Sequence, residues 1–444
     1  HAISPKTDIS INIFALDASR KSVGFRENRV SQVDDLQAPR DLIVGNFRNW
    51  GAEARFLTRY NLFKTEQALL IGAKYYQSNN KERQGPGSTS ADADFNFADV
   101  EFPEYSRQSD FTFPNLNVAL FAEHIFKLSQ KFTVTPGVRV DFIKTQSKGV
   151  YKNIIFDLAG NAILNQSIPD NRSFDRSFVL LGVGASYKVS YAAEIYSNLS
   201  QNYRSVTFSD IRITNPSLSI DPNITDEQGY TFDLGARGKF KNFLRYDFGI
   251  FYLSYQDRLG VVVRGVSDIQ DERFRGNIGD AITYGFEGFV DWNIWETFSS
   301  NENVRLNTFL NLAFTESQYT KSQENNVEGK QVEFIPKVNL KTGISFGYGD
   351  FLSSVQYTYL TKQFTDATNS PRDFSSQSGV IGEIPSYDIL DFSLSYTYKR
   401  FKIESGINNL LNTNYFTRRA TGYPGPGIIP SQPRTFYGLL QIKL

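Results

Sequence analysis

The sequence predicts an all-β fold, a transmembrane antiparallel up-and-down β-barrel, and three observations support this prediction. Apolar and polar residues alternate over stretches longer than ordinary strands. The connections alternate between very short and long, and no stretch reaches the roughly 18 apolar residues that a spanning helix needs. The length of 444 residues by itself suggests two or three domains. The composition argues against that division, because 38 residues are Phe, 24 are Tyr and 32 are Gly.

The alternation has a period of two residues, which places one set of side chains on each face of a strand. In residues 304–314 the even positions are mostly apolar, while the odd positions include Arg305, Asn307 and Asn311. Three further segments show the same pattern: 132–142, 338–346 and 390–398. One face of each predicted strand is therefore apolar and the other polar.

The connections fall into two classes. Short ones lie near residues 62–64, 128–131, 188–190, 241–242, 349–350 and 399–400. Long polar ones cover about 25–48, 79–112, 147–176, 203–227, 265–281, 317–335, 367–385 and 412–431. A meander of strands with all long loops on one side explains this order of connections. It predicts about 16 strands of about 10 to 16 residues, which is longer than the usual length of a strand. Residues 243–264 read as one strand that is interrupted near 256–258.

A water-soluble β-sandwich or propeller is the alternative architecture. Strand length favours the membrane barrel, because a spanning strand needs about 9 to 11 tilted residues and the predicted strands exceed this. Short turns at one end and long loops at the other are typical of outer-membrane barrels. Aromatic residues near strand ends would form interfacial girdles in a barrel and core in a sandwich: Tyr187, Trp292, Trp295, Tyr357, Tyr359, Tyr396 and Tyr398.

The residue types exclude several kinds of chemistry. Lys plus Arg equals Asp plus Glu at 47 each, so no net charge draws the chain to nucleic acid. The absence of Cys excludes disulfides, cysteine zinc sites and thiol catalysis. Only His1 and His124 are present, and we interpret His124, within an alternating strand, as structural or interfacial. We find no nucleophile elbow, phosphate loop or metal-ligand spacing, and we expect neither an enzyme nor a cofactor.

Several motifs resemble a known family. Residues 407–415, Ile-Asn-Asn-Leu-Leu-Asn-Thr-Asn-Tyr, resemble the N-L-x-D/N-x-x-Y stretch of TonB-dependent outer-membrane receptors, and residues 432–437 resemble their closing P-R strand. Three further segments resemble the family's F-x-E and P-G-x-R strand pair and its G-x-E strand: 121–123, 136–139 and 285–287. The resemblance covers nearly all of the chain in the expected order. The closing loop looks most like the iron(III) dicitrate branch of the siderophore receptors.

The resemblance implies a receptor in the cell outer membrane, crossing it many times. It would import a ferric chelate, iron(III) dicitrate or a related siderophore, with energy from the TonB complex. Receptors of the family have an N-terminal plug and 22 strands. We therefore expect residues 1–444 to be the C-terminal part of the barrel, without the plug, the first strands and the TonB-contacting segment. We also expect a monomer in contact with membrane lipid and lipopolysaccharide.

Three alternatives to this function stay open. The first is a receptor of the same family for another cargo, such as cobalamin, haem or a glycan. The second is a passive porin, because a barrel of 16 strands could close by itself. The third is an outer-membrane hydrolase, which His124 without an evident partner disfavours.

The predicted binding residues lie where strands leave the wall or in the outer loops, since guanidinium forks match the carboxylate oxygens of a ferric chelate two at a time. The predicted set is Arg204, Gln201, Tyr203, Asn414, Tyr415, Arg418 and Arg419. The adjacent pair Arg418–Arg419 is the leading candidate, because it directly follows the family motif. Arg212 and Arg372 lie in similar loops. Alternatively, these arginines bind lipopolysaccharide phosphates or only solvate the loops.

Overall fold

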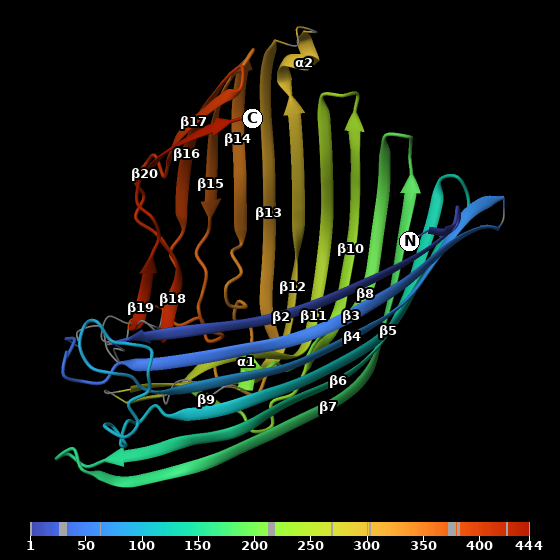
Figure 1. Ribbon diagram of the computed structural model, residues 1–444. Helices are drawn as coiled ribbons and strands as arrows, with labels where there is room; N and C mark the ends of the chain where they lie inside the picture. Colours follow the sequence, from blue (N-terminus) through green and yellow to red (C-terminus); the bar gives the residue numbers. More distant parts are fainter. Residues whose placement is uncertain are drawn as a thin grey trace.

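The computed structural model describes residues 2–25, 33–62, 64–211, 218–267, 270–299, 301, 303–371, 379, 382–422 and 425–443. These residues form 20 strands and two short helices (Figure 1). Strands make up 71% of the described residues, which confirms the predicted all-β class. Neither helix in the described ranges is long and apolar enough to cross a membrane.

The elements follow one another along the chain with few interruptions. The first ten strands are β1 (Ala2–Ser4), β2 (Thr7–Gly24), β3 (Asp41–Leu62), β4 (Thr65–Pro86), β5 (Ser109–Lys127), β6 (Phe132–Phe156), β7 (Ala162–Lys188), β8 (Ala193–Arg204), β9 (Leu218–Ile220) and β10 (Glu227–Phe240). The other ten are β11 (Leu244–Ser267), β12 (Gln270–Asn293), β13 (Val304–Ser322), β14 (Val338–Tyr348), β15 (Phe351–Leu360), β16 (Tyr387–Tyr398), β17 (Phe401–Asn408), β18 (Phe416–Gly422), β19 (Gly425–Pro430) and β20 (Thr435–Ile442). The helices are α1 (Phe208–Ile211) and α2 (Ile294–Phe298).

The sheet is an antiparallel meander, as the sequence predicts. Each long strand pairs with the next, β8 pairs with β10, and β17 pairs with β20. No ladder joins β2 to β20 within the described residues, so the sheet is open there. The prediction of about 16 strands is wrong as a count. Four strands of three to seven residues, β1, β9, β18 and β19, make the difference, because such short segments carry no readable alternation.

The predicted turns and loops are confirmed only in part. Strands end and begin at the predicted short turns, for example between β14 and β15. The interruption predicted near 256–258 is confirmed by a register shift between Tyr255 and Arg258. The long loop predicted at 147–176 is wrong, because β6 and β7 stay paired up to Phe156 and Ala162. That at 265–281 is likewise mostly strand. Polar residues lie on both faces of these extensions, so the ladder continues without the alternation that would reveal it.

The outward face of the sheet is apolar and exposed. On β7, Val179, Leu181 and Val183 are 52%, 56% and 41% exposed, whereas the residues between them are half-buried. On β14, Ile344 and Phe346 are likewise exposed. A sheet in water would have to bury such a continuous apolar surface. The arrangement therefore fits strands whose outer face meets lipid rather than the core of a sandwich.

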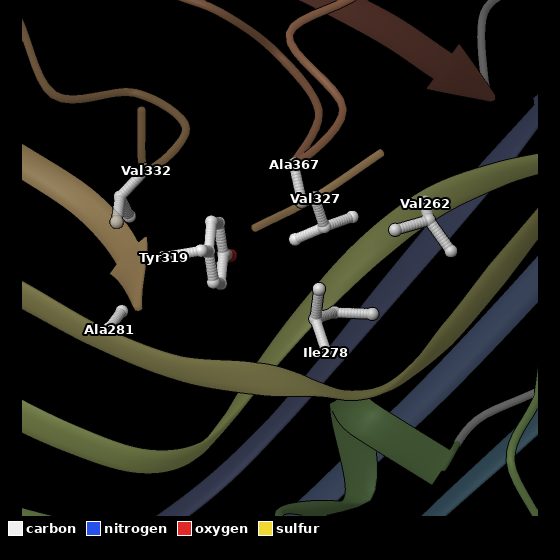
Figure 2. Packing of buried hydrophobic residues seen from close by; sticks show 7 residues of the cluster. All are labelled: Val262, Ile278, Ala281, Tyr319, Val327, Val332 and Ala367. Carbon is white, nitrogen blue, oxygen red and sulfur yellow. The ribbon is translucent and has the colours of Figure 1, made fainter. Parts of the chain in front are cut away.

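The buried apolar clusters lie among the outer loops. The Tyr319 cluster consists of Val262, Ile278, Ala281, Tyr319, Val327, Val332 and Ala367, and it joins the extensions of β11, β12 and β13 to two long loops (Figure 2). The Ile211 cluster consists of Val206, Ile211, Ile224 and Leu259. Burial of these side chains holds the loops against the strand ends.

The sheet divides into two parts between β7 and β8. Their ladder covers only Gly182 to Lys188 of β7, and beyond it β2–β7 incline away from β8–β17 (Figure 1). The connection that carries α1 and β9 spans this division. Its Phe208 ring contacts the Phe113 ring of β5 at 5.4 Å, and the Val206 carbonyl accepts from Arg176 of β7 at 3.1 Å. On the other side, β9 pairs parallel with β12.

Candidate functional site

A cavity of about 580 Å³ lies at the loop end of the sheet, where several long connections meet. Its lining comes from the end of β8, α1, the shifted part of β11, β12, the connections β13–β14 and β15–β16, and β18. The lining residues are Arg204, Asp210, Leu259, Gly260, Val261, Arg275, Glu333, Phe334, Thr365, Thr417, Arg418 and Arg419. Four arginines face two carboxylates, which is a formal surplus of two positive charges.

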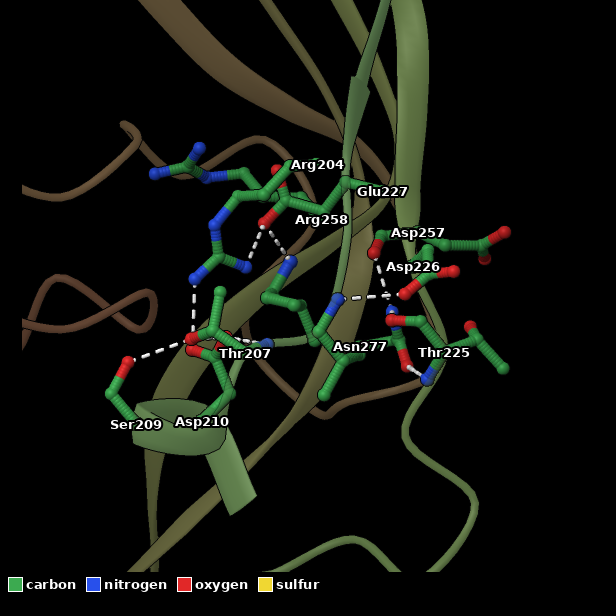
Figure 3. Close-up of polar contacts among 12 residues, drawn as sticks. Arg204, Thr207, Ser209, Asp210, Thr225, Asp226, Glu227, Asp257, Arg258 and Asn277 are labelled. Atoms are coloured by element: carbon green, nitrogen blue, oxygen red, sulfur yellow. Dashed lines mark hydrogen bonds and ion pairs between the residues drawn. The ribbon is translucent and has the colours of Figure 1, made fainter. Parts of the chain in front are cut away.

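Arg204 is held by two carboxylates. It lies directly across the β8–β10 ladder from Glu227, so both side chains share one face. The Nη1 of Arg204 donates to Oε1 of Glu227 at 3.2 Å, and its Nη2 donates to Oδ1 of Asp210 at 2.8 Å (Figure 3). Glu227 also accepts from the Leu259 N–H at 2.7 Å. Burial raises the pKa of the Glu227 carboxyl above its usual range, although Arg204 opposes this shift.

Arg275 and Arg204 together hold α1. The Nη1 of Arg275 donates to the Ser209 carbonyl at 2.7 Å. Burial lowers the pKa of Arg275, and Asp210 acts against that shift. Within α1, Asp210 accepts from the Thr207 N–H at 2.9 Å and from the Thr207 hydroxyl at 2.8 Å. The segment is therefore fixed to the cavity wall by one carboxylate and one carbonyl.

The two arginines of β18 differ in their surroundings. Arg419 is only 9% exposed and donates to the Gly379 carbonyl at 2.8 Å and to the Glu383 carbonyl at 2.9 Å. Its guanidinium also lies 5.2 Å from the centre of the Phe416 ring. Arg418 is exposed and lines the cavity, with no ion-pair partner in the described part of the chain. Arg419 thus braces the β15–β16 connection, whereas the Arg418 side chain is exposed at the cavity.

Glu333 brings the β13–β14 connection to the same cavity. Its Oε2 accepts from the Tyr319 hydroxyl at 2.8 Å, and its Oε1 lies 3.5 Å from Nη2 of Arg258. Burial and the nearby Glu333 carboxylate raise the pKa of Tyr319. Tyr319 belongs to the apolar cluster of Figure 2, so this network links the cavity wall to the packed loops.

The comparisons with known proteins decide the family. The profile described as TonB dependent receptor-like, beta-barrel matches residues 8–410. The chain belongs to this family. The sequence stretches that resemble TonB-dependent receptors are therefore confirmed at the level of the family.

Solved structures share the fold. The unliganded ferric citrate transporter FecA aligns with a TM-score of 0.73 at 17% identity, over 99% of this chain and 60% of that one. The ferric yersiniabactin uptake receptor FyuA from Yersinia pestis gives 0.71 at 14% identity, over 99% and 59%. The copper transporter OprC gives 0.71 at 14%, over 99% and 65%. The chain thus spans less than two thirds of the length of these proteins.

In this TonB-dependent receptor barrel, the cavity brings together three of the predicted binding residues, Arg204, Arg418 and Arg419. Gln201 and Tyr203 lie outside the lining. The strand register places them on the face of β8 opposite Arg204.

Gln201 and Tyr203 make contacts at the division between β7 and β8. The Oε1 of Gln201 accepts from the Leu181 N–H at 2.8 Å, directly where the β7–β8 ladder ends. Tyr203 stacks on Phe178 at 3.6 Å and donates its hydroxyl proton to Asp226. Both side chains therefore close the seam between the two strands.

Asn414 and Tyr415 do not belong to the cavity lining. Asn414 is exposed, and Tyr415 stacks on Tyr387 at 4.8 Å. Arg212 and Arg372 lie outside the described residues. His124 lies beside Tyr60, with its Nε2 at 2.5 Å from the hydroxyl.

The sequence-based prediction missed Asp210, Arg275 and Glu333. All three fall within segments predicted as polar loops, where charged residues are common. The only signal in the sequence for a binding site was that several loop segments carry arginines. Nothing in the sequence indicated which loops meet.

Proposed function

We propose that this chain forms part of an outer-membrane receptor that binds a ferric chelate and imports it with energy from the TonB complex. The observation that carries the proposal is the cavity at the loop end, with four arginines in its lining. Proteins of similar structure are described as transporters or receptors of ferric citrate, ferric yersiniabactin and copper. A carboxylate siderophore such as iron(III) dicitrate fits the chemistry of the cavity best.

The lining can recognise an anionic chelate in three ways. Arg418 presents a planar fork that can donate to two carboxylate oxygens at once. Arg204 and Arg275 line the same cavity, so a ligand with several carboxylates could reach them together with Arg418. The hydroxyls of Thr365 and Thr417 add donors to the lining.

We assign direct ligand contact to Arg204, Arg275 and Arg418, with Arg419 holding the closing loop in place. For Gln201, Tyr203, Asn414 and Tyr415 we propose an indirect role, because none of them lines the cavity. The receptor would change no covalent bond. Binding would shift the loops, and the TonB complex would supply the energy for import.

The exposed apolar face supports a position in the outer membrane, with lipid around the strands and lipopolysaccharide near the loops. We propose a monomer, because a continuous lipid-facing surface leaves no reason for a partner subunit along the strands. The polar inner face would then enclose the transport path.

The test is binding of radiolabelled ferric citrate to the full-length protein, followed by uptake with and without energised membranes. The proposal expects saturable binding that excess unlabelled chelate displaces, and uptake that stops when the membrane is de-energised. Binding of cobalamin, haem, a glycan or copper in place of ferric chelates would redirect the assignment to another cargo. Uptake independent of energy would support the passive pore.

A further inference from the structure

We infer that Asp210 is an internal counter-ion that competes with the ligand for Arg204, and so keeps simple anions out of the cavity. The inference rests on the proposed function and names a residue that determines its specificity. The Oδ1 of Asp210 accepts from Nη2 of Arg204 at 2.8 Å. Asp210 is 6% exposed, while the Arg204 side chain is 45% exposed. Asp210 and Glu227 therefore already occupy the two Nη groups of a guanidinium that faces the cavity, and of the two carboxylates only Asp210 lines the cavity.

Asp210 is fixed in this position by its own segment. It accepts from the N–H and the hydroxyl of Thr207, so its second oxygen is already engaged. The next residue, Ile211, is 1% exposed and packs in the cluster with Val206 and Leu259. The segment cannot move aside without opening this cluster. An entering anion must therefore exchange with the Asp210 carboxylate at Arg204 while α1 stays in place.

The charge of Asp210 acts on a second arginine. Arg275 binds the adjacent Ser209 carbonyl at 2.7 Å, and Asp210 is the nearby carboxylate that favours its charged form. Arg418, by contrast, has no ion-pair partner in the described residues. A small anion gains only a contact with Arg418, and it meets the repulsion of Asp210 at the other two arginines. A chelate with several carboxylates can hold Arg418 and still compete for Arg204.

The experiment measures the affinity of the full-length protein for inorganic phosphate and for ferric citrate. Asp210→Asn removes the charge and keeps the size, so phosphate affinity should rise about tenfold, which corresponds to one unit of pKa-scale interaction. Asp210→Ser, which keeps an acceptor for the Thr207 N–H, should give the same rise. Asp221→Asn is the matched control, since Asp221 lies in the same connection but outside the lining. It should leave phosphate affinity unchanged.

A double-mutant cycle with Arg204→Ala isolates the proposed pair. In the Arg204→Ala background, Asp210→Asn should change phosphate affinity by much less than it does in the wild type. Unchanged phosphate affinity in both Asp210 variants, or an equal rise in Asp221→Asn, would overturn the inference. Failure of the wild type to bind ferric citrate would instead overturn the proposed function, while a rise in phosphate affinity would still support the role of Asp210.

Discussion

Separate replacement of Arg418 and Arg419 tests whether the two adjacent arginines do different work. Arg419 donates to two carbonyl groups in the β15–β16 connection and is almost fully buried. Charged hydrogen bonds contribute about 1.5 to 3 kcal/mol each, so Arg419→Ala, which removes two of them, should reduce the local stability of this connection by about 3 to 6 kcal/mol. Arg418 makes no such contact with the described residues, and Arg418→Ala should leave that stability unchanged.

The binding affinity should respond in the opposite way. Loss of the Arg418 fork should weaken ferric citrate by about 1.5 to 3 kcal/mol, or about 10- to 150-fold in Kd. Arg418→Lys should recover only part of this loss, because an ammonium cannot present two parallel donors. The double Ala variant should lose about 2 to 5 kcal/mol of binding while the sheet still assembles.

Two measurements separate these effects. Titration calorimetry gives the affinity, and hydrogen exchange of the Ile384 amide reports the connection, because this N–H donates to the Gln363 carbonyl at 2.8 Å. Faster Ile384 exchange in Arg418→Ala, or full binding in that variant with a normal amount of protein in the membrane, would refute the assigned division of roles.

Three further predictions concern Leu394 on the outward face of the sheet, Gln201 at the contact between β7 and β8, and the buried carboxyl group of Glu227. Leu394→Lys should destabilise the sheet in lipid vesicles by about 2 to 4 kcal/mol if the residue lies near the bilayer centre. The control Ser395→Lys, on the other face of the strand, should not destabilise the sheet. Equal losses of stability in chemical unfolding of the two variants would contradict the assigned faces. Gln201→Ala leaves the Leu181 N–H without its acceptor, so this amide should exchange about five- to thirtyfold faster at unchanged ferric citrate affinity; weaker binding would place Gln201 at the ligand. Burial raises the pKa of Glu227 above 4.5, so its contribution to stability is full below that pH and falls as the pH rises through the raised pKa. Glu227→Gln should therefore gain loop stability relative to the wild type as the pH rises above 4.5, as measured by thermal melting, and a difference that stays constant with pH would contradict the shift.

The fold was largely predictable because lipid imposes a period of two on each strand. The interruption at Tyr255–Arg258 was visible for the same reason, since the alternation changes phase there. The extension of β6 and β7 to Phe156 and Ala162 was not visible. Polar residues lie on both faces of those extensions, and such a sequence resembles a loop.

The sequence predicted the chemistry of the candidate site, but it did not predict all of the residues that form the site. Arg204, Arg418 and Arg419 were found because arginines near strand ends suit an anionic ligand. Asp210 and Arg275 were missed because the contact between α1 and β12 depends on loop conformation, for which the sequence has no periodic signal. The positions of Gln201 and Tyr203 could have been predicted more sharply. Both share the parity of the apolar Leu199 on β8, and this parity places them away from Arg204.

The location of the buried clusters has a consequence for how substitutions act on the two halves of each long strand. Tyr319, Val327 and Val332 are apolar side chains kept away from water, so a polar replacement there should cost stability, as in any water-soluble protein. On the outward face of the same sheet, Val179 and Leu181 are apolar because their solvent is hydrocarbon. The inner side chains at that level can be polar without loss. A single strand such as β13 therefore carries apolar side chains on its outward face in the membrane segment and on its inward face in the outer segment. Laboratory evolution of these two segments would follow opposite hydrophobicity rules.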